Sequence, residues 1–178
     1  ERVRDIFIIG CYTGLRFSDL TKIKQGNIEN DIIEIEQTKT GGTVFVPLRP
    51  VAKNLLNKYS NNIPTISNQR FNEYLQEVAK LCTGLQKEIT YSEIKGGKKL
   101  KITRPKFELV SSHTARRSFA TNEYKAGDLT ISEIMSITGH KTEKAFYKYI
   151  RETPKDSALR VQEKWAKRIE TKSHLKAV

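Results

Sequence analysis

Residues 138–149, with the sequence Thr-Gly-His-Lys-Thr-Glu-Lys-Ala-Phe-Tyr-Lys-Tyr, place a phenol, Tyr149, nine residues after an imidazole, His140. An apolar segment ends just before this stretch, so we expect His140 at the C-terminus of a helix, where a capping histidine is common. Tyr147 and Tyr149 are two residues apart and would face different directions on a helix. Periodicity alone therefore leaves open which of the two phenols is presented to a ligand.

A second polar segment, His113-Thr-Ala-Arg116-Arg117, lies upstream. His113 and Arg116 are three residues apart, so both side chains would lie on one face of a helix capped by Ser111 or Ser112. Arg117 would point roughly 100° away, toward solvent or a DNA backbone. A histidine at a helix start commonly bonds a backbone carbonyl, but an arginine stacked beside it makes this interpretation weaker.

Arg16 and Lys39 supply two further cations nearer the N-terminus. Gly14 is placed to end a helix in a left-handed cap, so Arg16 would lie near the start of the next helix. A guanidinium and free backbone N–H groups at a helix start suit an oxyanion, although an ion pair with Asp19 is the simpler alternative. Lys39 precedes a Gly-Gly turn, where lysines are usually just solvated.

These side chains make chemical sense as one group around a phosphate. Two guanidiniums would bind the non-bridging oxygens, and a phenol would attack the phosphorus. A lysine and two imidazoles would donate and accept protons. The group consists of Arg16, Lys39, His113, Arg116, His140 and Tyr149. No metal ligand set accompanies them in the sequence, because the cysteines lie in apolar patterns and His174 lies in a terminal tail. The sequence also lacks a nucleotide-binding loop, so neither a metal nor another cofactor is expected.

Apolar periodicity predicts one domain over residues 1–178, mostly α-helical with small antiparallel β-hairpins, an α+β fold. The first hairpin is expected at 31–48 around Gly41-Gly42, and the second within 88–110 around Gly96-Gly97. Helices are expected near residues 3–14, from 16–18 onward, and over 50–59, 68–82, 113–120, 131–137, 144–150 and 155–169. The last helix, within a C-terminal segment 155–178, carries one apolar stripe formed by Ala158, Val161, Trp165 and Ile169.

The chain carries 32 Lys and Arg against 20 Asp and Glu, a formal net charge of +12 over 178 residues. This charge predicts a polyanionic partner, with nucleic acid ahead of acidic lipid. The second hairpin has a basic tip that we expect to contact a phosphate backbone, formed by Lys95, Lys98, Lys99 and Lys101. A solvated basic surface is the plainer alternative.

Cys11 and Cys82 have no metal-ligand spacing and resemble buried free thiols of a reducing, cytoplasmic compartment. No apolar run approaches the length of a membrane span, and no signal-peptide pattern opens the chain. The sequence lacks an initiator Met and begins within an apolar helical pattern, so we expect an N-terminal part to precede it.

Four segments, in order along the chain, resemble motifs of the catalytic domain of the tyrosine recombinases, or phage-type integrases. The first is Thr13-Gly-Leu-Arg16-Phe-Ser-Asp19-Leu, which is similar to the family motif TGLRxSEL, and the second is Gln37-Thr-Lys39-Thr with Val46-Pro-Leu, which is similar to the family's β-hairpin lysine segment. The third is His113-Thr-Ala-Arg116-Arg-Ser-Phe-Ala-Thr, which is similar to HxLRHxFAT. The fourth is Thr138-Gly-His140 with Tyr149, which is similar to LGH…Y. Asp19, Arg117 and Thr138 replace the Glu, the His, and the Leu or Met that many members have. None of these changes removes a catalytic group.

The resemblance implies DNA strand exchange without a metal or a high-energy cofactor. The family's nucleophile matches Tyr149, which would form a 3′-phosphotyrosyl link, and Tyr147 becomes a packing or helix-orienting residue. The resemblance implies that Arg16 and Arg116 stabilise the transition state and that Lys39 protonates the leaving 5′-oxygen. It implies that His113 accepts the phenol proton or shares that role, and that His140 donates a hydrogen bond to a non-bridging oxygen. Asp19 would orient Arg16.

The resemblance also implies partners. These are double-stranded DNA with specific recombination sites, and three further copies of the chain on synapsed DNA, with a monomer in free solution and no membrane. The segment 155–178 would dock on a neighbouring copy or on its own domain, and an N-terminal domain would help to clamp DNA. The hairpin around Gly96-Gly97 is similar to those of integrases of mobile elements and prophages. The alternatives are a type IB topoisomerase, a catalytically silent DNA-binding module and a metal-dependent phosphodiesterase.

Overall fold

The computed structural model describes residues 1–150 and 152–175, with side chains at all of these positions except 95, 167 and 169–175. Its first helix, α1 (Arg2–Thr13), packs most extensively against α5 (Ser112–Ala126), although the two are far apart in sequence. Gly14 ends α1 in the predicted left-handed conformation, with φ of 65°. A Cβ at this position would lie 2.4 Å from the ring of Phe119 on α5, so glycine is required for both reasons.

A three-stranded antiparallel sheet follows the short helix α2 (Phe17–Leu20) and a 3₁₀ turn, η1 (Gln25–Asn27). Its strands are β1 (Ile28–Glu29), β2 (Ile32–Glu36) and β3 (Thr43–Pro47), in that order. The β2–β3 pair confirms the predicted first hairpin, and alternate residues such as Ile33 and Val46 pair on its buried face. Strand β1 was not predicted, because two residues carry no periodic signal.

Two helices cover the hydrophobic core beside this sheet, α3 (Pro50–Lys58) and α4 (Asn68–Lys80). Both were predicted, but α4 ends two residues early. Cys82 therefore lies beyond the helix and is exposed, so the prediction that it is buried was wrong. Cys11 is partly buried, and burial raises the pKa of its thiol to about 11.

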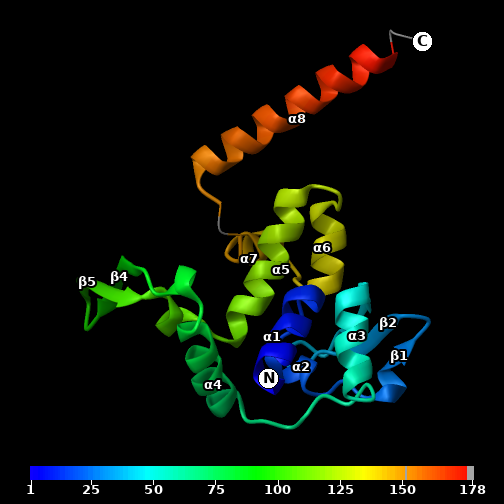
Figure 1. Ribbon diagram of the computed structural model, residues 1–178, viewed down its shortest axis with the longest axis vertical. Helices are drawn as coiled ribbons and strands as arrows, with labels where there is room; N and C mark the ends of the chain where they lie inside the picture. The colour runs from blue at the N-terminus through cyan, green and yellow to red at the C-terminus, as the bar shows by residue number, and fades with distance from the viewer. Residues whose placement is uncertain (151, 176–178) are drawn as a thin grey trace.

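The second predicted hairpin is also present, as β4 (Glu88–Lys95) and β5 (Lys98–Pro105). It lies between the 3₁₀ turns η2 (Thr83–Leu85) and η3 (Lys106–Leu109) and projects from the rest of the molecule (Figure 1). Because Lys98, Lys99 and Lys101 are all exposed on β5, the hairpin presents a basic edge to solvent. The side chain of Lys95 lies outside the described residues.

Three helices complete the chain: α6 (Ile131–Thr138), α7 (Glu143–Tyr147) and α8 (Pro154–Leu175). Helices α5, α6 and α7 enclose a second, smaller core around Phe119, Ile134 and Phe146. Helix α7 ends at Tyr147, so the prediction that a helix continues to Ile150 was wrong, and Tyr149 lies in the turn that follows.

Helix α8 extends away from the other helices (Figure 1). Of its predicted apolar stripe, Val161 and Trp165 are exposed, and the side chain of Ile169 lies outside the described residues. Within the described part of the chain, no helix has the combined length and apolarity that crossing a bilayer demands.

Candidate active site

Arg116 is the most deeply placed of the predicted site residues, because its side chain on α5 is fully buried. One terminal nitrogen, Nη1, donates to the carbonyl of Gly14 at 2.7 Å, and the other, Nη2, donates to the carbonyl of Thr138 at 2.6 Å. The guanidinium thus joins the C-terminal ends of α1 and α6. Burial, followed by the nearby charge of Arg16, lowers the pKa of Arg116 to about 10, so it remains cationic at neutral pH.

His140 follows α6 immediately, as predicted from the apolar segment before it. Its Nε2 lies 3.3 Å from Nη2 of Arg116, and its Nδ1 lies 2.7 Å from the hydroxyl of Thr138. Burial, and then the charges of Arg116 and Arg16, lower the pKa of His140 to about 4. The ring is therefore neutral near pH 7 in the protein without DNA.

Tyr149 lies partly buried against the other site residues. Its ring centroid is 4.7 Å from that of His140 and 6.2 Å from that of His113. The guanidinium carbons of Arg116 and Arg117 lie 5.6 Å and 6.0 Å from the same centroid. Arg117 is exposed, as predicted, yet it also reaches the tyrosine, which the helical periodicity did not indicate.

Tyr147 lies elsewhere, which separates the two candidate phenols. Its ring packs edge-on against Tyr124 on α5, with centroids 6.2 Å apart. Its side chain makes none of the ring or cation contacts that Tyr149 makes to His140, His113 and Arg116, as far as the described residues show. The short α7 explains the difference, because the chain turns after Tyr147 and carries Tyr149 back toward α5.

Arg16 and Lys39 are connected through Asp19, whose side chain is fully buried. Asp19 Oδ2 lies 3.9 Å from Nη1 of Arg16, which is an ion pair without a hydrogen bond. Its other oxygen, Oδ1, accepts hydrogen bonds from the backbone N–H and the hydroxyl of Thr38, at 2.8 Å and 2.9 Å. Asp19 therefore anchors the loop that carries Lys39 at least as firmly as it orients Arg16.

His113 lies at the first turn of α5 and is exposed. Partial burial lowers the pKa of His113, and so do the positive charges of Arg117, Arg116, Arg16 and Lys39, in that order. These effects place all the predicted cations within electrostatic reach of one imidazole. The predicted group of six thus comes from five segments of the chain that lie near one another, whereas Lys98, Lys99 and Lys101 lie apart on the projecting β4–β5 hairpin (Figure 1).

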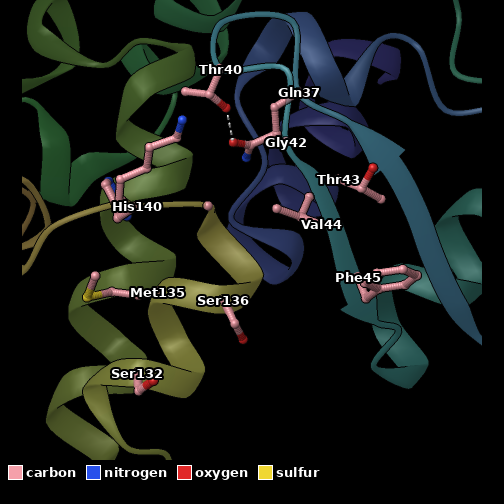
Figure 2. A pocket seen from close by; sticks show the side chains of 12 residues that line it. Gln37, Thr40, Gly42, Thr43, Val44, Phe45, Ser132, Met135, Ser136 and His140 are labelled. Carbon is pink, nitrogen blue, oxygen red and sulfur yellow. Dashed lines mark hydrogen bonds between the residues drawn. The ribbon is translucent and has the colours of Figure 1, made fainter.

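Gln37 belongs to the same cluster, and sequence reasoning assigned it no role. Its buried amide donates to the carbonyl of Thr138 at 3.1 Å and accepts from the hydroxyl of Thr40 at 2.8 Å (Figure 2). A Cβ at Gly139, where φ is 69°, would overlap this amide. Gln37 lies within the lysine segment, but its contact across 101 residues of sequence leaves no local signal.

A groove of about 470 Å³ lies beside this cluster, between β3 and α6 (Figure 2). Val44, Phe45, Met135 and Ser136 line its walls, and His140 lies at one end. Because His140 is the only member of the predicted group of six among its lining residues, the groove adjoins the polar cluster and does not contain it. The described residues hold no group of three or more His, Cys, Asp or Glu side chains that could bind a metal ion.

Two buried guanidinium nitrogens give the cluster its chemical character. Nη1 of Arg16 and Nε of Arg116 have no hydrogen-bond partner among the described residues. Buried polar groups are normally paired, so these donors are suited to a ligand that supplies acceptor oxygens. A tetrahedral oxyanion beside Tyr149 would satisfy both donors.

Comparisons with solved structures show the same fold. One is a λ integrase fragment (residues 75–356) dimer bound to a COC′ core site, with a TM-score of 0.61 and 20% identity over 86% of this chain and 53% of that one. Another is the XerH site-specific recombinase bound to a palindromic difH substrate, with a TM-score of 0.62 and 16% identity over 91% of this chain and 46% of that one. A third is the Tn1549 transposon integrase (residues 82–397, R225K) bound to circular intermediate DNA, with a TM-score of 0.62 and 16% identity over 90% of this chain and 57% of that one.

The chain therefore spans about half the length of these proteins. Among curated protein sequences, none matches the chain. The mostly helical fold with small antiparallel sheets is confirmed by the structural matches. Residues 2–156 match the sequence model of the phage integrase family, so the chain belongs to the phage integrase, or tyrosine recombinase, family and represents its catalytic domain.

Proposed function

We propose that this domain cleaves and rejoins DNA strands at specific recombination sites, through a covalent 3′-phosphotyrosyl intermediate on Tyr149. The observation that carries the proposal is the pairing of one phenol with two guanidiniums, each of which has a buried nitrogen without a hydrogen-bond partner among the described residues. Tyr149 lies against Arg116 and His140, while Nη1 of Arg16 and Nε of Arg116 lack partners among the described residues. This arrangement suits a phosphodiester whose phosphorus faces the phenol oxygen.

The reaction follows from the charges and protons of these groups. The Tyr149 oxygen attacks phosphorus, its proton passes toward His113, and the bond to the 5′-oxygen breaks as Lys39 supplies a proton to that oxygen. The pentacoordinate transition state gains negative charge, which Arg16 and Arg116 stabilise. The phosphoester energy stays in the protein–DNA link, so attack by another 5′-hydroxyl reverses the step and joins the strands.

His140 and Asp19 support these steps. His140, next to Arg116, would hydrogen-bond a non-bridging oxygen. Asp19 holds the Lys39 loop through Thr38 and faces Arg16, so it would align the proposed general acid with one arm of the phosphate clamp. Because charge and general acid both come from side chains, this scheme requires no metal.

We extend the proposal to the assembly and its biological setting. Similar structures include a λ integrase dimer bound to a core site and a λ integrase tetramer bound to a Holliday junction. By analogy, four copies of the present protein would synapse two double-stranded sites, and its substrate would be a mobile element or prophage that it integrates and excises. The net charge of +12 supports the choice of DNA as partner.

The proposal can be tested without knowledge of the target site. A pool of nicked duplexes with randomised sequence is incubated with the protein and a chelator, and covalent complexes are captured under denaturing conditions. We expect a protein–DNA adduct through a 3′-phosphate that leaves a free 5′-hydroxyl, and a common sequence among the captured duplexes. Absence of any adduct, or cleavage abolished by the chelator, would refute the proposal. Capture without sequence preference, together with relaxation of supercoiled plasmid, would point instead to a topoisomerase.

A further inference from the structure

Thr138 provides a hydroxyl directly behind the His140 ring, at the position where many members of the family have Leu or Met. It is the last residue of α6, and its side chain is fully buried. Its Oγ1 donates to the carbonyl of Ile134 at 2.8 Å, the usual acceptor for a threonine one turn along a helix. The same oxygen lies 2.7 Å from Nδ1 of His140.

The number of protons available limits the direction of these bonds. A hydroxyl has one proton, and a carbonyl can only accept. If the Thr138 proton is directed at Ile134, a lone pair of Oγ1 faces Nδ1 of His140, and Nδ1 must carry the ring proton. On the opposite side of the ring, Nη2 of Arg116 lies 3.3 Å from Nε2 and can only donate. Both neighbours therefore select the same tautomer.

We propose that Thr138 is a positioning residue that holds His140 with its proton on Nδ1 and with Nε2 bare and directed at Arg116. Its consequence for cleavage rests on the proposed function. His140 can donate to a non-bridging oxygen only through a proton on Nε2. While Oγ1 accepts from Nδ1, that proton has to be gained from solvent, and the ring donates as an imidazolium.

The charged groups around the ring make this proton uptake dependent on DNA. The positive charges of Arg116 on α5 and Arg16 before α2 disfavour protonation of the ring, and the ring of Tyr149 packs against it with centroids 4.7 Å apart. A phosphate bound between the two guanidiniums would offset their charge. The proton affinity of His140 would then rise when DNA binds, and the donor would form only in the complex.

The tautomer can be observed directly in the protein without DNA. Two-bond ¹H–¹⁵N correlation spectra of the histidine rings near neutral pH distinguish a protonated Nδ1 from a protonated Nε2. We expect His140 to be protonated on Nδ1 in the wild type and in Thr138→Ser, and to gain a detectable Nε2-protonated fraction in Thr138→Val, where Arg116 alone still favours the first form. Thr13→Val is the matched control, because Thr13 is also fully buried and its hydroxyl donates to the carbonyl of Ile9, one turn back. An Nε2-protonated wild type, or an unchanged tautomer in Thr138→Val, would overturn the proposal.

Cleavage kinetics test the consequence for catalysis. In single-turnover reactions on a captured nicked duplex, we expect the wild-type rate to fall as pH rises and His140 loses its second proton. Thr138→Val should lower the maximal rate by about tenfold, as is typical for loss of a group that orients a functional histidine, and should flatten this alkaline decline. Thr138→Ser should restore both. A Thr138→Val profile identical to that of the wild type would overturn the catalytic role. If the wild type forms no adduct, the proposed function fails, while the ring spectra still decide the tautomer.

Discussion

At the scale of single residues, the two arginines of the site differ in what else they hold. Arg116 is fully buried and donates to the carbonyls of Gly14 and Thr138, so it ties two helix ends together. Arg16 makes a 3.9 Å ion pair with Asp19 and leaves Nη1 unbonded among the described residues. Arg116 thus combines a structural role with its proposed catalytic role, whereas the proposed role of Arg16 is mainly catalytic.

This difference predicts separable effects of alanine substitutions. Arg16→Ala should lower the cleavage rate by about 10²- to 10³-fold, a typical cost of removing one oxyanion donor, with a smaller loss of stability than Arg116→Ala because Asp19 keeps its hydrogen bonds from Thr38. Arg116→Ala should show a comparable loss of rate and also lower the free energy of unfolding by about 2 kcal/mol, because two buried carbonyls lose a donor. Chemical denaturation and single-turnover cleavage measure the two quantities. Equal stability of the two variants would contradict the structural role of Arg116.

The sequence points to the polar side chains that the structure places near one another, because polar groups without a local partner are conspicuous in an apolar pattern. It does not predict the bonds of Gln37 and Thr38, since each depends on a contact between segments far apart in the chain. The choice between Tyr147 and Tyr149 likewise needed more than periodicity. The family resemblance points to Tyr149, and the early end of α7, which residue spacing alone places incorrectly, brings Tyr149 beside His140.

At the scale of secondary structure, one ionic cluster fastens the start of α1 to the end of α3. The buried carboxylate of Asp5 accepts hydrogen bonds from Lys58 at 2.7 Å and from Tyr59 and Arg4, each at 2.8 Å. Burial alone would raise the pKa of Asp5, but these bonds together lower it from an ordinary 3.8 to about 2. The cluster therefore stabilises the fold only while Asp5 is ionised.

The depressed pKa of Asp5 predicts loss of stability in acid. A carboxyl whose pKa is lower in the folded state than in the unfolded state gives stability that is complete above about pH 4 and disappears as pH falls toward 2. The free energy involved is at most about 2.5 kcal/mol, because a pKa difference of one between the two states corresponds to about 1.4 kcal/mol. Urea unfolding at pH 5 and pH 3 should show this decrease for the wild type and a smaller one for Asp5→Asn. Asp31→Asn, which removes an exposed partner of Lys53, should behave as the wild type. An unchanged decrease in Asp5→Asn would refute the assignment.

Helix α8 exposes large apolar side chains among its described residues. Leu159 is 48% exposed and Trp165 is 62% exposed. The helix contacts its own domain through Arg160, which binds Glu152 at 2.9 Å and lies over the ring of Tyr124. An apolar stripe on a projecting helix suits a neighbouring copy, so we propose that α8 docks between protomers on synapsed DNA.

Docking of this kind predicts two results. Removal of residues 155–178 should leave a folded protein that binds a single DNA site and no longer forms the synaptic complex, as seen by gel mobility and light scattering. Trp165 is the sole tryptophan of the chain, so its fluorescence should shift to the blue when the complex assembles. A truncated protein that unfolds or aggregates would show that α8 belongs to its own core instead.

At the scale of the whole molecule, the net charge of +12 predicts the salt dependence of DNA binding. Each phosphate contact releases counterions, with a slope of about −0.9 in the logarithm of affinity against that of salt. Replacing both Lys98 and Lys99 by Ala should flatten the slope by about 1.8 and weaken binding to all sequences alike. Lys53→Gln removes a charge already paired with Asp31 and should leave the slope unchanged. Equal slopes for the wild type and the double variant would mean that the hairpin is merely solvated.

The overall class of fold could be predicted, and its assembly could not. Helical and strand periods in the sequence located both hairpins and most helices to within a few residues. The packing of α1 on α5 and the projection of α8 depend on which surfaces meet, and local patterns contain no such information (Figure 1). Gly14 is an example: the sequence predicted that it ends a helix in a left-handed conformation, but it did not predict the close approach to Phe119.

The most direct test of the central claim is to identify the residue that carries the DNA. Wild type, Tyr149→Phe and Tyr147→Phe are each incubated with the captured nicked duplex, the adduct is digested with protease and nuclease, and the modified peptide is sequenced by mass spectrometry. We predict a nucleotide on Tyr149 in the wild type and in Tyr147→Phe, and no adduct in Tyr149→Phe, although that variant still binds the duplex. An adduct that persists in Tyr149→Phe and disappears in Tyr147→Phe would contradict the assignment of Tyr149 as the nucleophile.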